Sequence, residues 1–162
     1  MSHGITKIAY VSDVTLITLS SLPCDSRAVA EVLTALAENG VNVDMISQTA
    51  PQGGSIRLSF TISDDALATA LAVLAQLRKA NPELSPEILP GNSKLAFYDP
   101  NMVQTPGVAA GVFSLLSQVG IQVMLITTSE VDISILVSGH NLPDALSVVR
   151  DYYGLEPEKN RF

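Results

Sequence analysis

Polar side chains gather in two short segments on either side of a predicted helix. The first segment is Cys24, Asp25, Ser26 and Arg27, and the second carries Asn42, Asp44 and Gln48. The first turn of a helix has unpaired backbone N–H groups and the positive end of the helix dipole, so it can hold an anion. Asp44 can pair with an ammonium group, while the two amides satisfy other polar groups. The set suits a small zwitterion.

Two interpretations of these segments remain open. The guanidinium of Arg27 can clamp a carboxylate. Asp25 or Ser26 can instead cap the N–H groups that a ligand would use. Asp44 and Gln48 are also compatible with solvated strand positions near a sheet edge. The residues therefore define a candidate binding site that the protein's own side chains can also fill.

Catalytic and metal chemistry have weaker support. Cys24 before a helix and His140 in a later loop allow a Cys–His nucleophile, but a single cysteine without a local signature is usually structural. His3 and His140 lie far apart in the sequence, so we expect no metal site, and no cofactor is predicted. Asp64 and Asp65 are explained as charges at a helix start.

Composition narrows the class of protein. The chain has 162 residues, of which 47% are hydrophobic and 15% charged, which is typical of an ordered, aliphatic-rich globular protein. Sixteen acidic against nine basic residues give a formal charge of -7, so we expect no nucleic-acid partner. The single Cys and the absence of an apolar signal core in Met1–Lys7 predict a cytoplasmic location. The uncharged run Pro100–Ser129 is explained by a turn, a helix and a strand rather than by a membrane span.

The chain contains an internal repeat. Ala28–Thr49 aligns with Val108–Ser129 at a shift of 80 positions, and Ile56–Leu74 aligns with Val131–Val149 at a shift of 75. The five extra residues of the first copy fall in Ala50–Gly54, whose composition predicts a hairpin loop. The repeat predicts two similar lobes.

Each copy predicts the order strand, helix, strand, strand, helix. In the first copy these elements are Val14–Ser20, Ala28–Asn39, Val41–Gln48, Ile56–Ile62 and Ala66–Lys79. In the second they are Leu95–Tyr98, Val108–Val119, Ile121–Thr128, Asp132–Val137 and Leu142–Tyr153. Between the copies, three prolines in Asn81–Ser93 indicate a linker with room for a short edge strand at Glu87–Leu89.

A βαββαβ unit needs a fourth strand after its second helix. The second copy has none, because the residues after Gly154 are polar and broken by a proline. We expect Ile5–Val11 to cross over and complete the second lobe. The predicted fold is α+β, with two βαββαβ lobes whose helices cover one face of antiparallel sheets. The predicted domains are residues 12–91, residues 92–155 with strand 5–11 inserted, and a tail at 156–162.

Three motifs of the repeat carry a family resemblance. Gly40–Gln48, Thr105–Ala110 and Ile126–Val137 together resemble the tandem ACT regulatory region of bacterial aspartate kinases, and the similarity runs from Ile5 to Gly154. The resemblance implies ferredoxin-like ACT lobes, a homodimer formed through them, and feedback sensing of an aspartate-family amino acid such as lysine or threonine. The family's kinase domain is missing, so the chain is expected to be non-catalytic. It is expected to be either a stand-alone chain or a regulatory (beta) subunit that acts with a separate catalytic subunit. The alternative is a non-binding dimerisation scaffold or a remnant of a longer kinase.

The resemblance also implies site residues. In the family, the positions matching Asn42, Asp44 and Gln48 line the effector pocket. The implied ligand-binding set is Cys24, Asp25, Ser26, Arg27, Asn42, Val43, Asp44, Gln48, Thr105, Pro106, Gly107 and Gln122. The first lobe departs from the family pattern Pro-Asp-Lys-Pro-Gly, because Arg27 stands where the family has glycine. The second lobe keeps the turn but has Gln122 and Met124 where the first has Asn42 and Asp44, so it lacks the anion and is expected mainly to pair and to give backbone contacts.

Overall fold

The computed structural model describes residues 4–162, and His3 lies outside that range. The chain forms two compact units, which we describe separately. The first lobe is residues 13–91, with which Phe162 also groups. The second lobe is made of the described residues up to Ser12 together with Asn92–Arg161. Strands β1 and β4 each contribute one part to each lobe.

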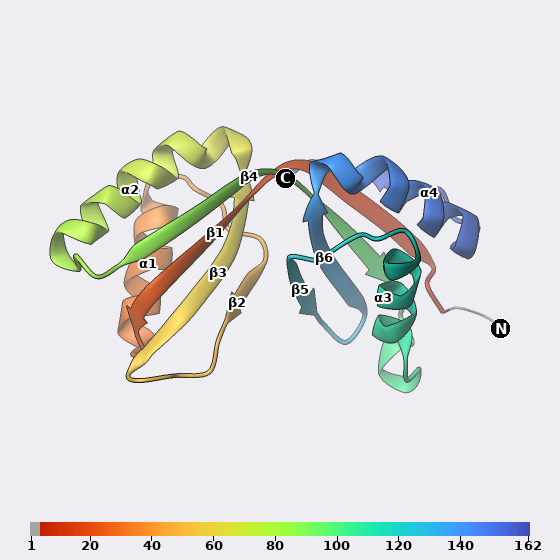
Figure 1. Ribbon diagram of the computed structural model, residues 1–162, viewed down its shortest axis with the longest axis horizontal. Helices are drawn as coiled ribbons and strands as arrows, with labels where there is room; N and C mark the ends of the chain where they lie inside the picture. Colours follow the sequence, from red (N-terminus) through yellow and green to blue (C-terminus); the bar gives the residue numbers. More distant parts are fainter. Residues whose placement is uncertain (1–3) are drawn as a thin grey trace. The chain divides into compact units, whose positions relative to one another are not determined.

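The first lobe has a four-stranded sheet in the order β2-β3-β1-β4. Its elements are β1 (Lys7–Pro23), α1 (Ser26–Glu38), β2 (Ile46–Gln48), β3 (Ser55–Ser63), the 3-10 turn η1 (Asp64–Ala66), α2 (Leu67–Ala80) and β4 (Ser85–Tyr98). β3 pairs antiparallel with both β1 and β2. The two helices lie on the same face of this sheet (Figure 1).

The core of the first lobe fills the space between that sheet face and the helices. On α1, Val32 and Leu36 are buried and Val29 is half-buried, a spacing that aims one apolar stripe at the sheet. The strands meet it with Leu58 and Phe60, which are fully buried. α1 ends before Gly40, whose φ of 72° lets the chain turn into the next segment.

Asp64, in the turn before α2, forms hydrogen bonds with β1 and β4. Its carboxylate accepts a hydrogen bond of 2.5 Å from the Thr15 hydroxyl of β1 and one of 3.2 Å from the Gly91 N–H of β4. Ser63 caps the neighbouring Asp65 N–H at 3.3 Å. The two aspartates are thus helix-start groups, one of which also connects three elements of the first lobe.

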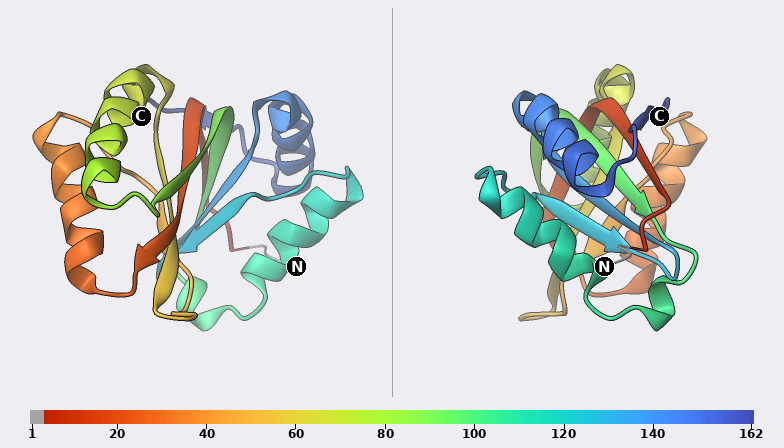
Figure 2. Two further views of the ribbon diagram at one scale, coloured as in Figure 1. Left: turned by 60° about the vertical axis from the view of Figure 1, so that its left-hand side comes forward. Right: turned by 90° about the vertical axis from the view of Figure 1, so that its right-hand side faces the viewer.

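The second lobe repeats the arrangement with the strand order β5-β6-β4-β1. Its further elements are the 3-10 turn η2 (Met102–Gln104), α3 (Val108–Gln118), β5 (Leu125–Thr128), β6 (Asp132–Ser138), η3 (Gly139–Asn141), α4 (Leu142–Tyr153) and β7 (Glu158–Lys159). In Figure 2, α3 and α4 lie on one face of the strands of their lobe. Their core includes Phe97, which packs near Tyr153 at a ring-centroid distance of 6.2 Å. Burial, with the neighbouring Tyr152, raises the pKa of Tyr153 above its ordinary value.

The predicted crossover of the N-terminal strand is confirmed. Ile5 and Ile8 are buried in the same core as Leu95 and Ile135 of the second lobe. The Thr6 N–H donates a 2.8 Å hydrogen bond to the Tyr98 carbonyl. The fold is therefore the expected α+β pair of βαββαβ lobes, the second of which is completed by the start of the chain.

Three element predictions need correction. The strands expected over Val41–Gln48 and Ile121–Thr128 are regular only in their C-terminal parts, which form β2 and β5. The edge strand predicted at Glu87–Leu89 is present, but it is part of a longer strand, β4, which starts at Ser85 inside the predicted linker and runs through Pro86 and Pro90. This part of β4 is at the edge of the first-lobe sheet, where a missing N–H is tolerated. The polar tail also forms the unpredicted β7, which pairs in parallel with β1.

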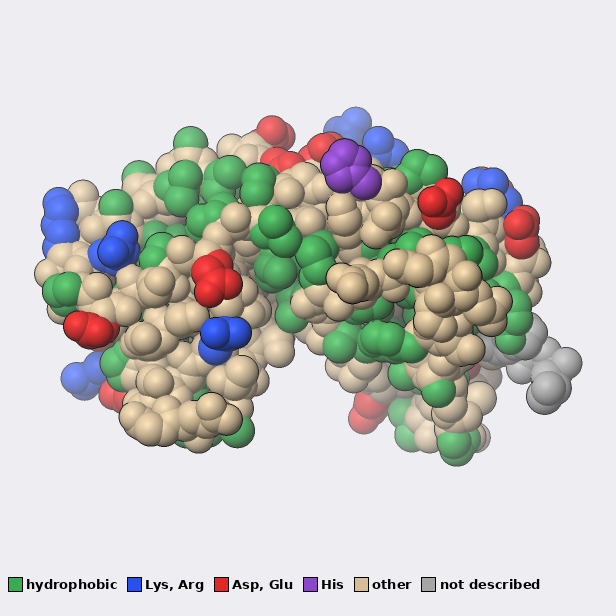
Figure 3. Space-filling model, in the orientation of Figure 1, with side chains coloured by type: hydrophobic (Ala, Val, Ile, Leu, Met, Phe, Trp, Pro, Cys, Tyr) green, Lys and Arg blue, Asp and Glu red, His purple; other side chains and the backbone are tan. Residues whose placement is uncertain are grey.

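The surface carries few charges. Figure 3 shows Lys, Arg, Asp and Glu side chains scattered over the visible face, with hydrophobic side chains over both α2 and α3. Leu71 on α2 is 43% exposed and Phe113 on α3 is 40% exposed. No helix within residues 4–162 is both long and apolar enough to span a membrane.

Candidate functional site

The turn between β1 and α1 is held in place by two backbone hydrogen bonds. The Cys24 N–H donates to the Gly54 carbonyl at 3.1 Å, which joins the end of β1 to the β2–β3 hairpin. The Ala28 N–H donates to the Asp25 carbonyl at 3.0 Å and closes the first turn of α1. The Cys24 thiol is free and exposed. The start of α1 is therefore fixed against the end of the hairpin.

Asp25 is the N-cap of α1. Its Oδ1 accepts a 2.8 Å hydrogen bond from the Arg27 N–H. One of the unpaired N–H groups at the helix start is thus satisfied by the protein itself, which is the capping that the sequence left open. The second carboxylate oxygen of Asp25 makes no hydrogen bond with the described residues.

Replacing Asp25 by alanine is expected to lower the free energy of unfolding by about 1 kcal/mol, because the cap is lost. Asp25→Asn, which keeps a capping oxygen, should cost a few tenths of that amount. Urea denaturation followed by circular dichroism measures both. Equal losses in the two variants would contradict a capping role for the side-chain oxygen.

A cavity of about 290 Å³ lies beside this turn. Its polar lining comes from Cys24, Asp25, Ser26 and Gln48. Its apolar lining is Val29, Ala30, Leu33 and Ile56. This volume is just below the range of roughly 300–1,000 Å³ for sites that hold drug-sized ligands, so it suits a smaller molecule. The first predicted segment and the far end of the second therefore meet at one cavity.

The sequence analysis missed the apolar wall of this cavity. Val29 and Leu33 are four residues apart, so they share one side of α1. That spacing was visible in the sequence, but it was indistinguishable from the spacing of residues that pack in the core. Only the position of Gln48 on β2 shows which apolar residues face the cavity.

Other predicted residues of the first lobe lie elsewhere. Arg27 is outside the lining of the cavity beside the turn, as are Val43 and Asp44. Val43 is partly buried against the first-lobe core. The Asp44 N–H donates to the Thr61 carbonyl at 3.1 Å, so its backbone is paired with β3.

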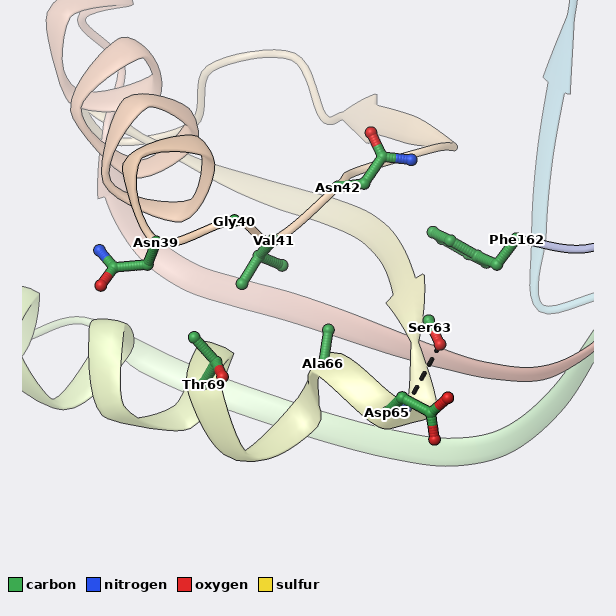
Figure 4. Close-up of a pocket in the computed structure, with 9 residues that line it drawn as sticks. All are labelled: Asn39, Gly40, Val41, Asn42, Ser63, Asp65, Ala66, Thr69 and Phe162. Carbon is green, nitrogen blue, oxygen red and sulfur yellow. Dashed lines mark hydrogen bonds between the residues drawn. The ribbon is translucent and has the colours of Figure 1, made fainter.

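Asn42 lines a different cavity, of about 410 Å³, at the other end of α1 (Figure 4). Asn39, Ser63, Asp65 and Phe162 also contribute to its wall. Asn42 and Gln48 are separated because extended chain advances roughly 3.3 Å per residue, so six residues cover about 20 Å. The three polar side chains of the second segment thus do not form one cluster.

The predicted turn of the second lobe has the expected backbone. Gly107 has φ 95° and precedes α3, and a Cβ there would meet no atom within 4 Å. Glycine is therefore favoured by the backbone conformation rather than by crowding. The Thr105 hydroxyl donates to the Asn101 carbonyl at 3.1 Å, and Pro106 lies between Thr105 and Gly107. Gln122 is exposed on the irregular segment before β5.

Among residues 4–162, no three His, Cys, Asp or Glu side chains come together as a metal site. Cys24 belongs to the first lobe and His140 to the second. The cavity beside Cys24 contains no histidine in its lining. The arrangement there offers hydrogen-bonding groups and one carboxylate around an apolar wall, which is the chemistry of a binding site.

The two-lobe fold agrees with the protein family whose profile the chain matches. The profile of the ACT domain matches residues 26–77 and 99–153, one match in each lobe. The chain belongs to the ACT domain family.

Comparison with related proteins shows which kind of ACT protein the chain resembles. It is 31% identical over 148 residues to an aspartokinase of Bacillus sp. (strain MGA3), which covers 91% of this chain but only 36% of that protein. It is 29% identical to the ligand-free regulatory subunit of aspartate kinase from Thermus thermophilus, with a TM-score of 0.84 and coverage of 91% and 97%. A structure of aspartokinase alpha and beta subunits is 26% identical, with a TM-score of 0.80 and coverage of 93% and 99%. The chain thus corresponds to the regulatory ACT part of an aspartate kinase and not to its catalytic domain.

Proposed function

We propose that the chain binds a small amino acid of the lysine or threonine class in the cavity beside Cys24 and so controls an aspartate kinase. The observation that carries the proposal is the meeting of the α1 start with Gln48 of β2 around one cavity of about 290 Å³. A helix start supplies N–H donors and a positive dipole end for the ligand carboxylate.

The acidic partner for the ligand ammonium is Asp25 in this proposal. Its Oδ1 caps α1, and its other oxygen makes no hydrogen bond with the described residues, so that oxygen is available to accept from an ammonium group. Asp44, to which the sequence analysis gave this role, is outside the lining. Gln48 then bonds polar atoms of the ligand side chain, and Val29 and Leu33 contact its methylene or methyl groups.

Control of a kinase follows from a shift in population. A ligand that binds one arrangement of the chain more tightly favours that arrangement, and a catalytic partner that senses the difference responds. We propose a separate catalytic subunit, in the manner of the alpha and beta subunits of the related aspartokinase. A cytoplasmic homodimer formed through the ACT lobes completes the proposal, supported by exposed apolar residues such as Phe113.

Calorimetric titration with lysine, threonine and methionine tests the binding step. Gln48→Ala is expected to weaken binding of the amino acid with the highest affinity by about 10-fold, because roughly one hydrogen bond to the ligand is lost. Gln76→Ala is the matched control, because Gln76 is exposed on α2 and lies outside this cavity. Its affinity should equal that of the unmodified chain.

Two outcomes would contradict the proposal. If none of the amino acids gives a heat of binding, the chain does not bind them, and the dimerisation scaffold remains as its function. Equal weakening in Gln48→Ala and Gln76→Ala would place the ligand away from the α1 start. The scaffold has one observation in its favour, because Asp25 already satisfies one helix-start N–H.

A further inference from the structure

A second cavity of the first lobe has a cationic lining. It measures about 410 Å³ and lies where the end of β1 meets the β2–β3 hairpin. Its lining residues are Ser20, Ser21, Thr49, Gln52, Ser55, Ile56 and Arg57. Arg57 is the one charged residue of this lining, and no carboxylate takes part. A cation surrounded by hydroxyl and amide groups is notable in a chain of net charge -7.

Arg57 is held in position by its backbone while its side chain is unpaired. The Arg57 N–H donates to the Thr49 hydroxyl at 3.0 Å, and the Arg57 carbonyl accepts from the Thr49 N–H at 3.0 Å. Within residues 4–162, the guanidinium makes no hydrogen bond or ion pair. The backbone of Arg57 is therefore fixed at the wall of the cavity, and its exposed guanidinium has five N–H donors free for a ligand.

The strand beside Arg57 is irregular at the residues that line the cavity. Leu19 pairs with Leu58 and Leu22 pairs with Ile56, so β1 has one extra residue in this stretch. Ser21 has φ 61°, a left-handed conformation that is unfavourable for a residue other than glycine. Bulges and strained backbone of this kind occur preferentially at functional sites, where they redirect side chains.

Ser20 supplies an independent observation. Its Oγ is buried and has no hydrogen-bond partner. A buried hydroxyl without a partner is costly and calls for an explanation. Ser20 as a residue is only partly buried and lines the cavity, so a rotation about its χ1 would turn this hydroxyl to a bound acceptor.

The second lobe carries an acidic residue at the position that corresponds to Arg57. The repeat aligns Arg57 with Asp132 and Ser59 with Ser134. The Ser134 hydroxyl donates to the Asp132 carboxylate at 3.1 Å, and Ser129 also donates to it. The second lobe thus has its own anion among hydroxyl groups. The first lobe has hydroxyl groups and a cation, and its β1–β3 pairing is bulged, whereas the corresponding β4–β6 pairing is regular.

We propose that this cavity binds a phosphate group. Arg57 would bond two oxygens with its planar guanidinium, and the hydroxyls of Ser20, Ser21 and Thr49 would donate to the others. The Thr49 oxygen already accepts from Arg57, which leaves its hydrogen for the ligand. Donors that come from β1, the hairpin and β3 surround a tetrahedral oxyanion better than a planar carboxylate. The site is separate from the proposed amino-acid site, with which it shares only Ile56.

Titration of the full chain with inorganic phosphate at constant ionic strength, followed by assigned amide NMR signals, tests the proposal. We expect saturable shifts at Ser20, Ser21, Gln52 and Arg57. Glycerol phosphate, used in a second titration, determines whether a monoester binds more tightly than the free anion. Acetate is the planar comparison and should bind at least about 10-fold more weakly, because it offers fewer acceptor positions to the same donors.

Two variants with a matched control complete the test. Arg57→Gln is expected to weaken phosphate binding by about 10-fold or more, because the charge-assisted fork is lost. Arg78→Gln removes the same charge from an exposed position on α2 outside the cavity and should leave binding unchanged. Ser20→Ala should weaken binding while raising the melting temperature of the phosphate-free chain, since an unpaired buried hydroxyl is removed.

The results that would overturn the proposal are specific. One is the absence of saturable shifts up to about 50 mM phosphate, which would mean that the chain has no useful affinity for phosphate. The others are equal affinities for acetate and phosphate, and equal losses of phosphate affinity in Arg57→Gln and Arg78→Gln. Amino-acid titration of Arg57→Gln separates the two proposals. Unchanged amino-acid binding alongside lost phosphate binding would show two independent sites.

Discussion

Phe60→Ala is expected to lower the free energy of unfolding by about 3–5 kcal/mol, because it removes a fully buried aromatic side chain from the first-lobe core. Phe60 lies on β3, between Ile17 of β1 and Ile46 of β2. It packs in a core with Leu36 of α1 and Leu58 of β3. The surrounding side chains relax only partly after such a truncation, and the remaining cavity adds to the lost transfer free energy.

Urea denaturation followed by circular dichroism measures this loss. Leu71→Ala is the control, because Leu71 is 43% exposed on α2 and its truncation should cost less than about 1 kcal/mol. A loss below that value for Phe60→Ala would show that the packing of the first lobe differs from the one described.

Gly4→Ala is expected to lower the free energy of unfolding by about 2–3 kcal/mol, although the substitution adds only a methyl group. Gly4 has φ 65°, which costs an L-residue about 1 kcal/mol or more. A Cβ at this position would also overlap the Oδ2 atom of Asp99, which is fully buried and therefore cannot move into solvent.

Gly120→Ala separates the two contributions. Gly120 has φ 70°, but a Cβ there would meet no atom within 4 Å, so it should lose only the backbone contribution of about 1 kcal/mol. Thermal and urea unfolding of the two variants give the comparison. Equal losses of stability in Gly4→Ala and Gly120→Ala would show that the overlap with Asp99 contributes nothing. The double variant Gly4→Ala/Asp99→Ala measures the coupling between these two residues directly.

The fold could be predicted because the repeat and the strand count constrain it together. Once two βαββαβ copies are aligned, a missing strand in the second leaves Ile5–Val11 as the segment to complete it, and the burial of Ile5 and Ile8 with Leu95 confirms the exchange. The hydrophobic alternation of β3 and the apolar stripe of α1 were equally clear, since burial selects one face of each.

The regular part of β2 could not be predicted. Apolar residues alternate with polar ones through Val41–Met45, as in a strand, but the Met45 N–H donates to the Thr61 hydroxyl at 3.0 Å. A side chain thus competes with the backbone ladder, and the pairing becomes regular only from Ile46. Hydropathy does not distinguish this irregular extended chain from a strand.

The candidate site was predictable only in part. Chain topology brings the α1 start and the end of β2 to the same end of a βαββαβ unit, so Cys24–Ser26 and Gln48 meet at one cavity. Assigning Asn42 to the same cluster ignored the length of the extended segment. The bulge at Ser20 and Ser21 left no signal, because serine is a poor indicator of left-handed backbone.

The exchange of the N-terminal strand also affects the order in which the chain can fold during synthesis. Residues 13–91 are contiguous, so the first lobe can close as soon as that stretch has left the ribosome. The sheet of the other lobe joins residues near position 8 to residues beyond position 130, so it forms last and at a high loop-closure cost. Until then the apolar side of the first part of β1 is uncovered, and exposed apolar surface of this kind favours aggregation of a partly folded chain.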